Sequence, residues 1–130
     1  TMTIDGKERQ FRGYWARGAA ATEINDDGTI APTAAAASIP FAPEIVIPAI
    51  AAMKERYGDA LYQQYGFLDA FNPTLGWFND DYLGIDQGPI VVMIENYRTG
   101  LVWEVMKKNP HIIRGLRRAG FRGGWLEGVE

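Results

Sequence analysis

Glu95 lies within an apolar segment and Asp86 lies just before it. A carboxyl group at such a position requires a structural or catalytic explanation. Residues 89 to 108 are apolar on nearly every side, yet they carry Glu95 and Arg98. A helix that is apolar all round is normally buried all round. Apolar surroundings favour the neutral form of a carboxyl group and suit it to general acid catalysis. Arg98, three residues on, is equally placed to pair with Glu95 as a structural ion pair, so both interpretations stay open.

Asp86 and Gln87 come directly before the predicted start of this helix at Pro89. A carboxylate near the positive end of a helix is stabilising by up to about 1 kcal/mol, which is reason enough for Asp86 to be there. The functional interpretation is that Asp86 points into a cleft at the helix start and meets a polar ligand. Asp86 is thus the second catalytic candidate, and Gln87 is a candidate for ligand binding.

The loop predicted over residues 66–88 mixes aromatic rings with carboxylates and amides. Its rings alternate with acidic and amide side chains in a pattern that suits carbohydrate: flat rings cover the C–H faces of sugars, and the polar groups bind hydroxyls. Loops of this length in compact domains are usually functional or disordered, and the large aromatic residues argue against disorder. The alternative is that the rings fill a core and the polar groups face water. The candidates for sugar contact are Asp69, Asn72, Trp77, Gln87 and Arg98.

The elements that must position these residues are mostly helices. We expect a helix over 43–57 bent at Pro48, a short helix over 60–65, a long helix over 89–108 and a last helix over 109–119 capped by Asn109. Residues 1–42 are predicted to be mostly loop, with a short helix within 31–38 and no strand longer than a few residues. Residues 120–130 form a tail. The predicted class is all-α, a single domain over 1–130 with about four helices, of which 43–119 is the helical part.

Composition excludes several classes of function. A formal charge of −3 argues against a nucleic-acid partner, which would favour a basic face. The absence of cysteine and the single histidine exclude thiolate zinc sites and multi-histidine metal sites, so no metal or cofactor is expected. No apolar run is long enough to span a bilayer without a charge, and the first ten residues show no signal-peptide pattern. Arg17 is expected to pair with an aspartate of segment 25–29.

Three segments together resemble a known bacterial family, the glucoamylase-like domain. They are Asp27-Gly-Thr-Ile-Ala-Pro-Thr-Ala34, Tyr65-Gly-Phe-Leu-Asp-Ala-Phe-Asn72 and the long string from Tyr82 to Trp103, which is highly specific. The resemblance covers roughly residues 13–112. The family includes endo- and exo-acting β-1,2-glucanases and a domain of cyclic β-1,2-glucan synthases.

The resemblance implies the C-terminal third of an (α/α)6 barrel, with loops at one end forming a sugar cleft. It carries over the cleft-wall positions Asp69, Asn72, Trp77, Asp86, Gln87 and Glu95, and it places the family's catalytic carboxylates largely outside this chain. The implied function is part of a glycoside hydrolase acting on β-glucan, with β-1,2 linkage favoured. It also implies a periplasmic or extracellular location, and contact with the missing barrel helices or self-association. The alternatives are a non-catalytic carbohydrate-binding fragment and a helical protein-interaction module.

Overall fold

The computed structural model describes residues 1–11 and 27–129, so the expected pairing of Arg17 lies outside the described residues. The described part is predominantly helical, with five α-helices and three short antiparallel strand pairs. The helices are α1 (Pro32–Ala37), α2 (Pro43–Tyr57), α3 (Gly84–Thr99), α4 (Leu101–Lys107) and α5 (Pro110–Arg118). The strands are β1 (Met2–Ile4), β2 (Lys7–Arg9), β3 (Tyr62–Gln63), β4 (Gly66–Phe67), β5 (Phe71–Asn72) and β6 (Trp77–Phe78), and η1 (Gly58–Ala60) and η2 (Gly124–Gly128) are 3-10 turns.

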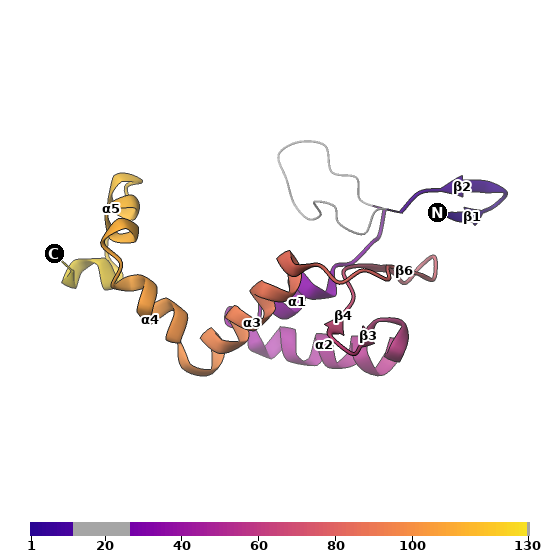
Figure 1. The fold of residues 1–130 in the computed structure, drawn as a ribbon, viewed down its shortest axis with the longest axis horizontal. Coiled ribbons are helices and arrows are strands. Elements are labelled where there is room, and N and C mark those ends of the chain that lie inside the picture. The colour runs from indigo at the N-terminus through magenta and orange to yellow at the C-terminus, as the bar shows by residue number, and fades with distance from the viewer. Residues whose placement is uncertain (12–26, 130) are drawn as a thin grey trace.

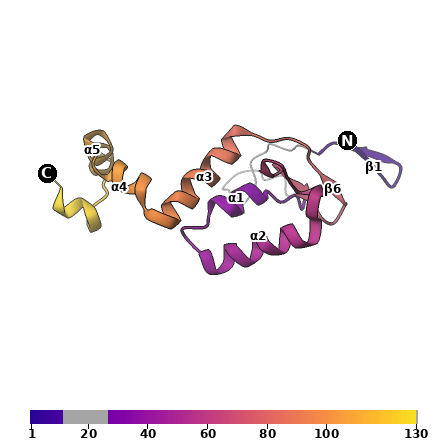
Figure 2. The same ribbon diagram turned by 60° about the horizontal axis from the view of Figure 1, so that its bottom comes forward.

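Helices α1, α2 and α3 form the packed part of the molecule (Figures 1 and 2), with α1 in contact with both of the others. The alanine-rich sequence of α1 lets neighbouring helices approach closely, and Pro32 starts it without loss of a hydrogen bond. The buried core cluster consists of Ala36, Leu61, Phe67 and Phe71. Helix α2 has the predicted bounds, with Pro48 inside and Gly58 at its end.

The prediction of a short helix over 60–65 was wrong. The turn η1 ends at Ala60, and Tyr62 then pairs with Phe67 in the β3–β4 hairpin. A second hairpin, β5–β6, pairs Phe71 with Phe78. The rings of Phe71 and Phe78 stack on each other with centroids 5.8 Å apart, and both pack at a tilt against Tyr57 of α2 at 5.0 and 5.6 Å. This aromatic packing overrides the local helical signal.

The long helix predicted over 89–108 is two helices, and it begins earlier. The carbonyl of Leu83 accepts hydrogen bonds from the N–H groups of Asp86 and Gln87, so α3 starts five residues before Pro89. It ends at Gly100, which adopts the left-handed conformation at φ 71° and separates α3 from α4. The Asn109 cap of α5 is confirmed: its side chain accepts a hydrogen bond from the N–H of His111 at 2.9 Å.

Helix α3 was expected to be surrounded, and within the described residues it is not. Asn96 is its one fully buried residue, and the side chain of Val91 is 68% exposed. Helices α4 and α5 extend away from the α1–α3 group toward the C-terminus (Figure 1). The exposed apolar side chains of α3 and α4 are Ile85, Val91, Val92, Ile94, Tyr97, Leu101, Trp103, Val105 and Met106. An apolar surface of this extent is unusual for a free domain face.

Candidate functional site

Asp86 lies in the first turn of α3 and is half-buried. Its Oδ2 atom is fully buried, and no donor group among the described residues forms a hydrogen bond to it. Burial, followed by a hydrogen bond with Asp69 and by the charge of Asp69, raises the pKa of Asp86 from 3.8 to about 6. A carboxyl group with such a pKa carries a proton for much of the time near pH 6, which is what a general acid requires.

Asp69, on the segment between the two hairpins, supplies the second carboxyl group. Its side chain is only 3% exposed, and Oδ2 accepts a hydrogen bond from Nδ2 of Asn79 at 3.1 Å. Backbone bonds fix this arrangement: the N–H of Asp69 donates to the carbonyl of Asp81, and the N–H of Asn79 donates to the carbonyl of Ala70. Asp69, seventeen residues earlier in the chain, interacts with Asp86 through its side chain and its charge.

Gln87 is held by the protein itself. Its Nε2 donates a hydrogen bond to the carbonyl oxygen of Phe67 in β4 at 2.8 Å. The bond connects the first turn of α3 to the β3–β4 hairpin. Binding of a ligand by Gln87 stays a prediction, and its amide oxygen is the atom that this bond leaves available.

Asn72, in β5, is completely buried and uses both ends of its amide. Nδ2 donates to the carbonyl of Asp27 at 2.8 Å, and Oδ1 accepts from the N–H of Leu75 at 3.1 Å. These contacts close the turn after β5 and attach it to the segment that precedes α1. The arrangement gives Asn72 a structural role, and its contact with sugar stays a prediction.

Trp77 lies opposite Asn72 in the β5–β6 hairpin and is half-buried. Its ring stacks on that of Phe11, with centroids 5.0 Å apart and an angle of 19° between planes. One face of the indole is therefore covered by the protein. Sugar stacking on Trp77 stays a prediction and concerns the other face.

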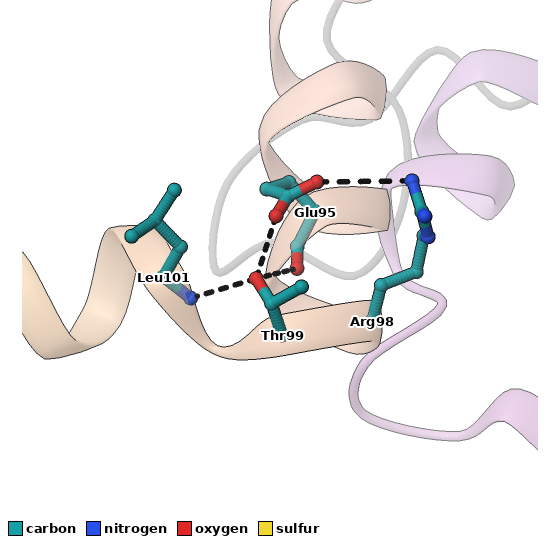
Figure 3. A network of polar contacts seen from close by, with 4 residues as sticks. All are labelled: Glu95, Arg98, Thr99 and Leu101. Atoms are coloured by element: carbon teal, nitrogen blue, oxygen red, sulfur yellow. Dashed lines mark hydrogen bonds and ion pairs between the residues drawn. The ribbon is translucent and has the colours of Figure 1, made fainter.

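Glu95 and Arg98 lie near the C-terminal end of α3 and form the expected contact (Figure 3). The pair is open to solvent. The Arg98 guanidinium lies 3.9 Å from Oε2 of Glu95, and the two side chains are 69% and 34% exposed, respectively. Oε1 of Glu95 accepts a hydrogen bond from Oγ1 of Thr99 at 2.6 Å. The apolar enclosure expected around Glu95 is thus missing from the described part of the chain.

Glu95 and Asp86 do not come together. Nine residues separate them on α3, which corresponds to about 14 Å along the axis and to roughly half a turn around it. Paired carboxyl groups in glycosidases are about 5 to 9.5 Å apart across the scissile bond. The two predicted catalytic residues therefore cannot act as such a pair on one bond, and Asp69 is the partner that the fold gives to Asp86.

The contribution of Asn79 was missed by the sequence reasoning. Nothing in its spacing distinguishes it from the other polar residues of the loop. The signal that could have found it is the hairpin: pairing of Phe71 with Phe78 places Asn79 beside Ala70 and hence next to Asp69.

Other types of site have little support in the described ranges 1–11 and 27–129. They hold no group of three or more His, Cys, Asp or Glu side chains that could bind a metal ion, and no helix there could cross a membrane. A hollow of about 490 Å³ beside the end of α2 contains none of the predicted site residues; its lining includes Lys54, Asp59, Tyr62 and Gln63.

Comparison with known proteins gives one consistent answer. A sequence model of the family described as "Putative glucoamylase" matches residues 1–110. The exo β-1,2-glucooligosaccharide sophorohydrolase (non-reducing end) of Parabacteroides distasonis is 41% identical over 93 residues, which are 72% of this chain and 13% of that protein.

Two solved structures extend the comparison to the fold. An endo-β-1,2-glucanase from Chitinophaga pinensis, in complex with sophorotriose and glucose, is 43% identical with a TM-score of 0.71 over 78% of this chain and 24% of its own. A protein from Bacteroides uniformis with the same glucoamylase description is 55% identical, with a TM-score of 0.71 over 78% of this chain and 25% of its own. The chain thus spans about a quarter of these solved relatives.

Proposed function

The chain belongs to the family described as "Putative glucoamylase", and from this we propose that it forms part of the sugar cleft of a hydrolase acting on β-1,2-glucan. The observation that carries the proposal is the 43% identity to a β-1,2-glucanase combined with a protonatable carboxyl group, Asp86, at the start of α3. Neither a similar fold nor a raised pKa would be sufficient alone. One fold can host many functions, and the pKa values of purely structural carboxyl pairs are also shifted.

In the proposed reaction Asp86 is the general acid. It gives its proton to the oxygen of the glucosidic bond as that bond breaks, while a second carboxylate deprotonates the attacking water or attacks the sugar directly. Within the described residues Glu95 is too far from Asp86 to be that second group. The second carboxylate is therefore proposed to come from outside this chain.

The finer architecture is also a proposal: the chain is the C-terminal part of an (α/α)6 barrel, and further barrel helices cover the apolar side chains of α3 and α4. Its support is the exposure of these residues in a chain that spans about a quarter of its solved relatives. Self-association of the chain through the same surface is the alternative, and sedimentation distinguishes a monomer from larger species.

Assays on glucans with different linkages test the proposed substrate specificity. The full-length protein should release reducing sugar from soluble β-1,2-glucan and none from β-1,3- or β-1,4-glucan of similar length, which serve as matched controls. Equal rates on all three would contradict the proposed linkage. Cleavage of none, together with tryptophan quenching by β-1,2-glucan, would instead support the binding-only alternative.

Localisation in the periplasm or outside the cell is proposed on the family resemblance alone. Fractionation of cells that express the natural protein tests this. Recovery in the cytoplasmic fraction would contradict it.

A further inference from the structure

We propose that Asp69 is a positioning residue for Asp86: the two carboxyl groups share one proton, which Asp86 carries and donates in a hydrogen bond to Asp69, and Asn79 keeps Asp69 as the acceptor of that hydrogen bond. The inference rests on the proposed hydrolase function for its consequence, but the sharing of the proton is a property of the fold that can be measured without catalysis. It also assigns a role to Asp69 other than contact with sugar.

The first support is the unpartnered atom of Asp86. Its Oδ2 is fully buried and has no hydrogen-bond donor within reach among the described residues. A buried carboxylate oxygen without a donor is costly. A proton on Asp86, donated to the buried carboxylate of Asp69, would give this oxygen the partner that it lacks.

The second support is the direction that Asn79 imposes. Its Oδ1 accepts a hydrogen bond from the N–H of Asp80 at 2.9 Å, so its Nδ2 must be the atom that faces Asp69. An amide N–H donated to Oδ2 of Asp69 stabilises a carboxylate there. The proton of the pair is therefore directed to Asp86 and not to Asp69.

Among the groups around Asp86, Asp69 supplies the dominant charge. Helix α1, which packs against α3, contains no titratable residue, and Gln87 beside Asp86 is neutral. Asp80 and Asp81, on the loop that leads into α3, are exposed to solvent. Within the described residues, burial and Asp69 together account for the raised pKa of Asp86.

The consequence for the proposed reaction is that Asp69 favours the reprotonation of Asp86 after each cleavage. The C–O bond breaks with its electron pair on the departing oxygen, which takes the proton of Asp86. Water adds to the sugar carbon and gives its own proton to the second carboxylate. Asp86 is then an anion beside the Asp69 anion, and their repulsion favours return of a proton from solvent to Asp86.

The test compares Asp69→Asn with Asp80→Asn in the full-length protein. Both remove one negative charge from the segment between β4 and α3, but only Asp69 interacts with Asp86. We expect the alkaline limb of the pH profile of kcat on β-1,2-glucan to move down by about one unit in Asp69→Asn, which means an approximately tenfold loss at pH 7 and little loss at pH 5. Asp80→Asn should leave the limb in place. An alkaline limb at the same pH in both variants would overturn the proposal.

A second measurement does not depend on activity and is made on the wild-type protein. The carboxyl carbon of Asp86, identified by its loss in Asp86→Asn, is titrated by NMR in the wild-type protein. A shared proton predicts a midpoint near 6 with two steps, and a single step near 3.8 would overturn it. A two-step titration in a protein that cleaves no glucan would support the shared proton and contradict the proposed function alone.

Discussion

Gln87 in α3 donates a hydrogen bond from Nε2 to the carbonyl oxygen of Phe67 in β4 at 2.8 Å. The bond fixes the first turn of the helix against the hairpin, and the neighbouring residue in that turn is Asp86. The same contact therefore serves both the fold and the candidate acid.

Replacement of Gln87 by alanine should have two effects. Loss of the bond leaves the carbonyl of Phe67, a buried residue, without this donor. This should lower the free energy of unfolding by about 1–2 kcal/mol. A displaced Asp86 should also lower kcat more than it changes KM. Urea denaturation and steady-state kinetics measure the two effects, with Gln64→Ala in the exposed hairpin turn as control. A change in KM alone would instead make Gln87 a sugar contact.

The raised pKa of Asp86 predicts a pH-dependent stability. The folded protein binds the Asp86 proton more tightly than the unfolded chain does, since the pKa rises from 3.8 to about 6. This contribution is complete below pH 3.8 and is lost as the pH rises through 6. Asp86→Asn should therefore raise the melting temperature at pH 7 and change it little at pH 3.5. An Asp86→Asn variant that is less stable than the wild-type protein at pH 7 would contradict the predicted direction of the effect.

Glu95→Gln should change kcat by less than about threefold. The side chain is partly exposed, it lies about 14 Å along the helix from Asp86, and glutamine can still accept the hydrogen bond from Thr99. Steady-state turnover of β-1,2-glucan by the full-length protein measures this. A loss of about 10²–10⁴-fold with unchanged stability would restore Glu95 as an acid or base.

Asn72→Ala should act on stability first. The side chain is fully buried, and its removal leaves the carbonyl of Asp27 and the N–H of Leu75 without these partners. We expect a loss of about 2–4 kcal/mol in the free energy of unfolding. Denaturant titration of the full-length protein measures it. Unchanged stability with weakened binding of β-1,2-glucan would support the original prediction of a sugar contact.

Much of the helical framework follows from local signals. Pro43 and Gly58 delimit α2, Asn109 caps α5, and the string around Asp86 indicated the family. The predictions of secondary structure that were wrong failed because of contacts between residues distant in sequence. The helix predicted over 60–65 became a hairpin because Tyr57, Phe71 and Phe78 pack together, and the break at Gly100 is followed by a cap that Asn96 makes to the N–H of Trp103.

The candidate site shows the same division. Sequence reasoning selected both Asp69 and Asp86, but it gave them separate roles: Asp69 as a sugar contact, and Asp86 beside Glu95 as a catalytic candidate. Residue types on one helix cannot reveal a partner seventeen positions earlier in the chain. The pairing of Asp69 with Asp86 depends on the hairpin that holds Asn79, which only the fold makes visible.

The most direct test of the proposed function is kcat of Asp86→Asn in the full-length protein on β-1,2-glucan. Asparagine has nearly the same shape but cannot deliver a proton, so we expect kcat to fall by about 10²–10⁴-fold. Binding of the glucan, followed by tryptophan fluorescence, should persist. A variant that binds glucan and turns it over at the wild-type rate would contradict Asp86 as the acid of this site.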